Sequence, residues 1–275
     1  MATNTFSKLP SPRKKALSSF SLDKRQKFVV SVLLLSALFF SIQLQIGKIG
    51  IYIVILLAIM TDLFFYWAMR HDLKENRMIS IFILPLFYSL AFGLFYFLIP
   101  TRFLFRMIIT IIYGFGLYSL FLSQNIFVVA AIRTIALLSG ARIVSFVITV
   151  LCYLFLVNTV LSLHLFLPTI LLLGFATFML TYHSLWTYAL QKTSYRLSLW
   201  AGGITLCLVE IASLLLFWPS SPTVLALYIT AMLYVFLGLS HVWMEKRLFK
   251  NVLWEFTWVG VIAMLFLLIF TSWGK

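Results

Sequence analysis

Long apolar runs, separated by short polar or Gly- and Pro-containing breaks, make up most of this chain after residue 27. A helix needs about 20 apolar residues to cross the hydrocarbon core of a bilayer, with about 17 as the lower limit. Nine runs reach that length, so the pattern predicts nine transmembrane helices packed as an all-α bundle. They are approximately Phe28 to Leu44, Ile51 to Met69, Met78 to Ile99, Phe103 to Leu122, Ile143 to Leu163, Thr169 to Leu190, Leu197 to Phe217, Thr223 to Ser240 and Val252 to Ser272.

The first 27 residues differ from the rest. They are polar and carry seven basic side chains against one acid, Asp23. The apolar run that follows ends in SIQLQIG, which has no A-x-A-like cleavage site, so we interpret the first span as a retained anchor rather than a secretory signal. We therefore expect residues 1–27 to be a disordered cytoplasmic tail and residues 28–275 to form one transmembrane domain.

One further apolar segment, from Asn125 to Gly140, is too short to span comfortably. Between an Asn that can cap its start and a Gly that can end it, about 14 residues make a helix of roughly 21 Å. If this segment lies flat on the inner surface, 17 of the 21 Lys and Arg residues fall inside; if it spans, the split becomes 11 to 9 and Arg133 enters the lipid. The positive-inside rule favours an interfacial amphipathic helix, with the N-terminus in and the C-terminus out.

Composition supports a membrane environment and changes the meaning of the charge. Apolar residues make up 63% of the chain and charged residues 10%, too few polar groups to cover a protein in water. The mean hydropathy is +1.07. A net charge of +14 would suggest nucleic acid for a soluble protein, but here it follows from basic residues gathered on the inner side, so we expect no nucleic-acid partner.

Two carboxylates fall deep within predicted spans. Asp62 lies about 12 Å from the inner end of the second span, and Glu210 about 10 Å from the outer end of the seventh. No Lys or Arg occurs at that depth, and an unpaired acid there favours its protonated form, as a proton-coupled site requires. The alternative is a structural hydrogen bond, with Tyr66 one turn from Asp62 and Ser213 about one turn from Glu210.

Weaker candidates for an intramembrane polar site are Asn158 in the fifth span and His183 in the sixth. Gly203 and Cys207 share a face of the seventh span with Glu210, which predicts helix packing there and places Glu210 inside the bundle. The sequence lacks the established catalytic, nucleotide-binding and metal-binding signatures, and no two histidines pair for haem, so we expect no cofactor.

Three stretches carry a resemblance to a family. They are QNIFVVAAIRTIALLSGARIVSF at Gln124 to Phe146, LFWPSSP at Leu216 to Pro222 and LGLSHVWMEKRLFKNVLWEF at Leu237 to Phe256. The chain resembles an uncharacterised family of bacterial multi-pass membrane proteins. The resemblance implies a bacterial plasma membrane and brings no activity or ligand with it.

Three functions are compatible with these features. The first is a membrane scaffold or accessory subunit whose basic tail docks on anionic lipid headgroups or on a membrane-protein partner. The second is a small-solute or proton-coupled transporter that uses Asp62 and Glu210, although the sequence shows no internal repeat. The third is a lipid-modifying enzyme, which the shortage of Asp, Glu and His near either face disfavours.

The orientation of the spans predicts the accessibility of two loops. In a cysteine-free variant, a cysteine introduced near Lys246 should react with a membrane-impermeant thiol reagent only after the membrane is opened. A cysteine introduced near Pro168 should react in intact cells. Labelling of the Lys246 region from outside would overturn the predicted topology.

Overall fold

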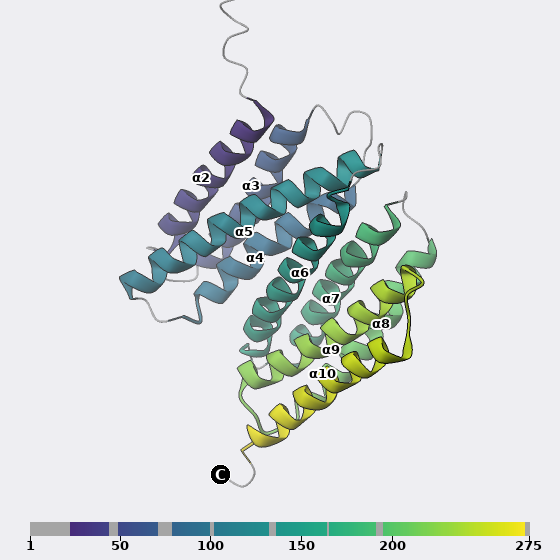
Figure 1. The fold of residues 1–275 in the computed structure, drawn as a ribbon. Coiled ribbons are helices and arrows are strands. Elements are labelled where there is room, and N and C mark those ends of the chain that lie inside the picture. Colours follow the sequence, from purple (N-terminus) through teal and green to yellow (C-terminus); the bar gives the residue numbers. More distant parts are fainter. Residues whose placement is uncertain are drawn as a thin grey trace, which may run out of the picture.

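The chain forms a bundle of antiparallel helices (Figure 1). A computed structural model describes residues 23–43, 49–70, 79–99, 102–131, 136–163, 165–190 and 195–272. Within these ranges nine helical spans are long and apolar enough to cross a membrane, which confirms the predicted number. The elements are α2 (Lys24–Ile42), α3 (Ile49–Met69), η2 (Ile79–Phe82) continued by α4 (Ile83–Tyr96), α5 (Phe103–Ala130), α6 (Leu138–Leu161), α7 (Phe166–Ala189), α8 (Tyr195–Leu215), α9 (Pro222–Met244) and α10 (Lys250–Ile269).

Two helices, α4 and α6, hold the bundle together. Helix α4 packs on α3, α6 and α7, while α6 packs on α4, α5, α7 and α9. Helices α8 and α10 lie at the edge, with α8 packed mainly on α7 and α10 on α9. Side chains at the edge are correspondingly less buried: α10 buries only Phe256 and Leu267. The peripheral helices therefore present most of their surface to the surroundings of the bundle.

Close contacts between α4 and its neighbours depend on glycine. At Gly93 an added Cβ would lie 2.6 Å from Cγ1 of Val54 on α3. At Gly116 it would overlap the Tyr88 hydroxyl group, which donates to the carbonyl of Tyr113 at 2.9 Å. Small residues let membrane helices approach closely, so these positions fix the spacing of α3, α4 and α5.

Basic side chains gather at one end of the bundle. Helix α2 begins and α10 ends at opposite ends (Figure 1). Of the described basic residues, Arg102 and Arg106 lie at the start of α5, at the end opposite the start of α2. The others lie at helix ends on the side where α2 begins: Lys24, Arg25, Lys27, Arg70, Arg142, Arg196, Lys246, Arg247 and Lys250. This asymmetry agrees with the expected orientation, which stays a prediction.

The interfacial helix predicted for residues 125–140 is wrong. Residues 125–130 are the last turns of α5, and α6 begins at Leu138. Asn125 does not cap a new helix, because it lies inside α5; its side-chain oxygen accepts a hydrogen bond from Nζ of Lys24. Arg133 lies outside the described residues. With 28 residues, α5 is about 42 Å long, so it must tilt or project beyond a hydrocarbon core of about 30 Å.

Candidate functional site

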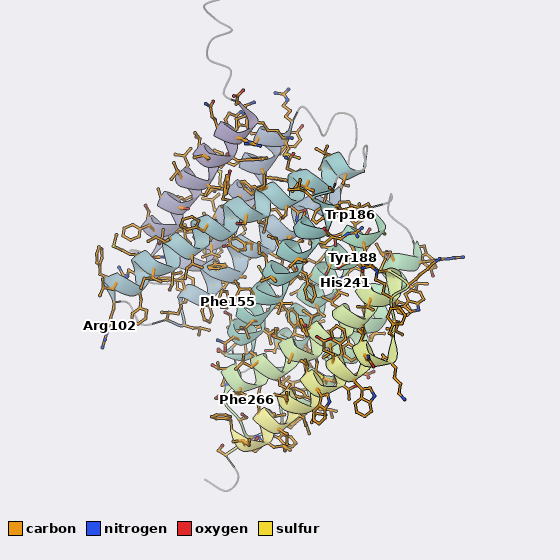
Figure 2. All side chains as sticks on the ribbon, viewed as in Figure 1. Arg102, Phe155, Trp186, Tyr188, His241 and Phe266 are labelled. Atoms are coloured by element: carbon orange, nitrogen blue, oxygen red, sulfur yellow. The ribbon has the colours of Figure 1, made fainter. Side chains whose placement is uncertain are left out.

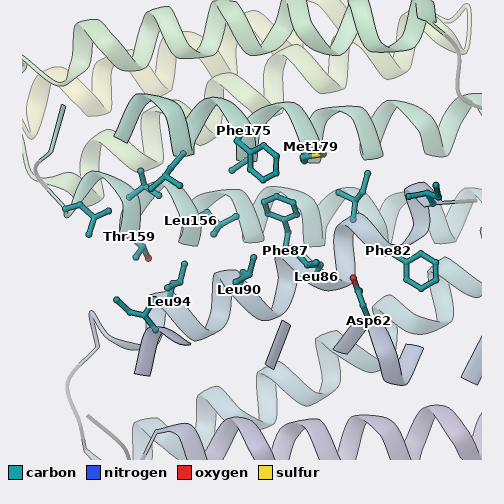
Figure 3. A pocket seen from close by; sticks show the side chains of 17 residues that line it. Asp62, Phe82, Leu86, Phe87, Leu90, Leu94, Leu156, Thr159, Phe175 and Met179 are labelled. Atoms are coloured by element: carbon teal, nitrogen blue, oxygen red, sulfur yellow. The ribbon is translucent and has the colours of Figure 1, made fainter. Parts of the chain in front are cut away.

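A cavity of about 560 Å³ runs between α3, α4, α6 and α7. Leu86, Leu90 and Leu94 recur every four residues and form a continuous apolar floor along one face of α4. The walls come from α6 and α7, and Phe175 and Met179 close one side (Figure 3). We call this cavity the α4 groove; its described lining is apolar except for Asp62 and Thr159.

Asp62 lies on the α3 side of the α4 groove, near Phe82 and away from Leu94 (Figure 3). Its carboxyl oxygen Oδ1 is buried and has no hydrogen-bond partner among the described residues. Tyr66, the partner that the sequence spacing suggests, is half exposed and makes no hydrogen bond to Asp62 in the described part of the chain. A polar atom buried in this way costs about 1–3 kcal/mol.

Thr61, the residue before Asp62, has hydrogen-bond partners for its hydroxyl group, in contrast to Oδ1 of Asp62. The hydroxyl group of Thr61 lies 2.7 Å from that of Ser89, which in turn lies 2.9 Å from the hydroxyl group of Tyr113. Thr61 also donates to the carbonyl of Leu57 at 2.9 Å. On α3, Thr61 therefore faces the neighbouring helix α4, and Asp62 faces the α4 groove.

Glu210 lies elsewhere, and the prediction that it faces the bundle interior is wrong. Its side chain is exposed on α8, as are Gly203 and Cys207. Ser213 donates to the backbone carbonyl of Glu210 at 2.8 Å and not to its carboxylate. The opposite face of α8 packs into the bundle through Leu197, Ala201, Thr205, Leu208, Ala212 and Leu215.

Asn158 and His183 are both buried in structural contacts. Thr223 at the start of α9 donates to Oδ1 of Asn158 at 3.3 Å, which ties α6 to α9. His183 donates from Nδ1 to the backbone carbonyl of Ser80 at 2.7 Å, so its Nε2 is left to accept from Nε2 of Gln124 at 3.2 Å. Neither residue lines the α4 groove, and the four candidate residues do not share a site.

A second polar cluster, which the sequence did not reveal, joins the end of α7 to α6 and α9. The hydroxyl group of Ser184 lies 3.1 Å from Nε2 of His241, and the rings of His241 and Tyr188 stack at 4.1 Å between centroids (Figure 2). In the sequence His241 sits at a predicted span end and gives no sign of this contact. Gln124 offered a signal only for the contact with His183, because a buried amide next to a long apolar run needs partners on another helix.

Arg142 holds this cluster together. Its Nε donates to the carbonyl of Thr187 at 3.2 Å and its Nη2 to that of Tyr188 at 3.3 Å, at the carbonyl-rich end of α7. Its Nη1 lies 3.7 Å from Oε1 of Glu245, the residue that caps α9. One guanidinium group thus links three helices through a fork of donors that lysine cannot provide.

Comparison with known proteins gives this chain a family but no function. A family model described as a protein of unknown function (DUF5656) matches residues 26–270. The chain belongs to the DUF5656 family. Membership of an uncharacterised family is thereby confirmed, while the bacterial origin stays a prediction. No curated protein and no solved structure matches this DUF5656 chain.

The contacts of Arg142 predict an unequal response of two arginines to substitution. Arg142→Ala should lower the free energy of unfolding by about 1–3 kcal/mol, because two helix-end carbonyls and Glu245 lose a charged donor. Arg247→Ala is the matched control: that side chain is 75% exposed and lies 3.9 Å from Glu245, so its loss should stay within about 0.5 kcal/mol.

Both changes are measured by reversible unfolding in mixed detergent micelles. The free energy of unfolding of Arg142→Lys should lie between those of wild type and Arg142→Ala, because lysine keeps the charge but lacks the several N–H donors of the guanidinium group. Equal losses for Arg142→Ala and Arg247→Ala would contradict this role of Arg142.

Proposed function

We propose that this DUF5656 protein is a multi-pass membrane protein that binds a membrane-dissolved amphiphile in the α4 groove. The amphiphile has a hydrocarbon chain and a polar end that carries an N–H or O–H donor. One observation carries the proposal: a buried carboxyl oxygen of Asp62 without a partner among the described residues, inside a cavity with apolar walls.

The shape of the groove suits a hydrocarbon chain. The lining runs along η2 and α4 from Ile79 to Leu94, a path of at least roughly 22 Å at 1.5 Å per helical residue. Ile79, Leu163 and Phe175 line the groove and are themselves exposed on the outer surface of the bundle. In a bilayer that surface faces lipid, so a ligand enters from the membrane and does not need an aqueous path.

The carboxyl group of Asp62 sets the chemistry of the polar end. A carboxylate accepts hydrogen bonds, and an amine or hydroxyl group of the ligand would supply a donor to the Asp62 carboxyl group, for whose Oδ1 the described residues supply none. An amine is favoured over a hydroxyl group, because it can take the proton of the Asp62 carboxyl group and then bind the carboxylate through a charge-assisted hydrogen bond, which is about twice as strong as a neutral one. The ligand would then place its amine beside Asp62 near Phe82 and its chain toward Leu94.

This proposal replaces the transporter hypothesis in the form that paired Asp62 with Glu210. A shared coupling site needs both acids in one cavity, and Glu210 lies on the exposed face of α8, outside the α4 groove. A membrane scaffold or accessory subunit is the second candidate. The observation in its favour is that α10 packs mainly on α9 and leaves a long apolar surface, with Trp254, Trp258 and Ile262 exposed, for a membrane partner.

The proposal is tested with spin-labelled lipid probes in vesicles that contain the purified protein. Spin-labelled stearylamine should show a larger motionally restricted fraction than the spin-labelled methyl ester of stearic acid, because only the amine offers Asp62 a charged donor. Asp62→Asn should lower the relative association of the amine by about tenfold, the loss of one charge-assisted hydrogen bond.

Two further variants locate the effect in the groove. Ala176→Phe narrows the α4 groove without touching Asp62 and should lower restriction of both probes. Glu210→Gln removes the other deep acid, which lies outside the groove, and should keep the preference for the amine. An equal restriction of amine and ester in the wild-type protein, or a preference that survives Asp62→Asn, would refute the proposed ligand class.

A further inference from the structure

A second cavity, of about 390 Å³, lies between α2 and α5. On α5 its lining includes Thr110, Gly114 and Tyr118, which recur every four residues and therefore share one face of the helix. On α2 it includes Val32 and Ser36, and a Cβ added at Gly114 would lie 2.8 Å from Oγ of Ser36. We call this cavity the α2–α5 groove; it is separate from the α4 groove, since the two share no lining residue.

The α2–α5 groove is open along one side. Leu33 on α2 and Ile111 and Phe115 on α5 line it and are each more than half exposed. From Thr110 to Tyr118 the lining extends about 12 Å along α5, most of the roughly 15 Å that one leaflet contributes to the hydrocarbon core. The open side faces lipid in a bilayer, so a hydrocarbon chain can lie in this groove.

Arg106 lies at one end of the α2–α5 groove, one turn before Thr110 and on the same face of α5. Its side chain is partly buried, and its Nε is buried without a hydrogen-bond partner among the described residues. Arginines near the end of a membrane helix usually extend their charged group to the lipid headgroups. Arg106 does so only in part, because its Nε stays within the protein surface and lacks an acceptor there.

Arg102 adds a second positive charge beside Arg106. It lies four residues earlier, at the start of α5, where its exposed side chain extends from the edge of the bundle (Figure 2). Like charges about one turn apart on a helix repel each other. Neither arginine has an ion-pair partner in the part of the chain that the structure describes. The described acids lie elsewhere: Asp23, Glu245 and Glu255 toward the end where α2 begins, Asp62 in the α4 groove and Glu210 on α8.

The place of this arginine pair sets it apart from the other described basic residues. Those at the opposite end of the bundle follow the positive-inside asymmetry, which needs no bound ligand. Arg102 and Arg106 depart from that asymmetry, so the topology of the chain does not account for them. Two positive charges without an acid, at the end of a groove with an apolar open side, are complementary to an anionic lipid.

We infer that the α2–α5 groove binds an anionic phospholipid, with its phosphate between Arg102 and Arg106 and one acyl chain along Thr110, Gly114 and Tyr118. A guanidinium group presents a fork of N–H donors that matches the oxygens of a phosphate. The phosphate supplies the acceptor that Nε of Arg106 lacks and offsets the repulsion between the two arginines.

Photoreactive lipids in vesicles that contain the purified protein test the inference. Phosphatidylglycerol and phosphatidylcholine carry the same diazirine in one acyl chain, and mass spectrometry locates the adducts after irradiation. Phosphatidylglycerol should label the two stretches that line the groove, residues 29–36 and 110–118, about fivefold more than phosphatidylcholine does. The reason is that the choline group of phosphatidylcholine offsets its phosphate charge.

Two double variants assign this preference to the arginine pair. Arg102→Gln with Arg106→Gln should abolish it, whereas Arg102→Gln alone, which changes an exposed side chain, should lower it about twofold. Arg247→Gln with Lys250→Gln is the matched control, because it removes two exposed charges at the opposite end of the bundle and should leave the preference unchanged. An unfolding midpoint close to that of wild type verifies that each variant folds.

Equal labelling of the groove stretches by the two lipids in the wild-type protein would overturn the inference. So would a preference that survives Arg102→Gln with Arg106→Gln, or one that the control lowers as much. Excess inorganic phosphate should leave the labelling in place, because the acyl chain in the groove adds to the binding of the lipid. Loss of labelling in its presence would identify a free anion as the ligand and would overturn the lipid assignment.

Discussion

In the hydrocarbon core of a membrane, water cannot satisfy polar groups, and the arrangement of this bundle follows from that constraint. The helices satisfy the backbone within each span. Polar side chains are satisfied between spans: Thr61 with Ser89, Tyr153 with Thr177 at 2.9 Å, and His183 with the carbonyl of Ser80. These contacts link α3 to α4, α6 to α7, and α7 to η2, so the polar residues fix which helices are neighbours and the apolar residues fill the space around them.

Asp62 and Glu210 depart from this arrangement in different ways. Asp62 has a buried oxygen without a partner among the described residues and lines an apolar groove, whereas Glu210 stands on an exposed helix face. Other atoms that are buried without a partner among the described residues belong to neutral side chains, such as Oε1 of Gln124, or to Arg106 at the start of α5. Asp62 is the acid among them, and a carboxyl group costs far more to leave unsatisfied than a neutral group. The buried carboxyl group of Asp62 therefore points to a partner outside the chain, a lipid-phase ligand.

Span number was predictable because length and hydropathy decide it locally. The helix boundaries between residues 125 and 140 were not predictable in this way. Asn125 lies in α5 and is held by Lys24 of α2, a contact between residues 101 positions apart in the sequence. The face of Glu210 was predicted wrongly because α8 has small residues on two sides. Ala201, Thr205 and Ala212 pack inward, so Gly203 and Cys207 remain outside. The depth of Asp62 was visible in the sequence, but the α4 groove beside it depends on how α3, α4 and α7 are spaced.

In the function proposed above, a ligand from the membrane supplies the missing hydrogen-bond donor to Asp62. An electron cryo-microscopy structure of the protein in lipid nanodiscs, with a bound antibody fragment to aid alignment, tests it most directly. We predict elongated density in the α4 groove that reaches from Leu94 to the carboxyl group of Asp62. A groove closed by side chains, with Asp62 hydrogen-bonded to a residue of its own chain, would contradict the account.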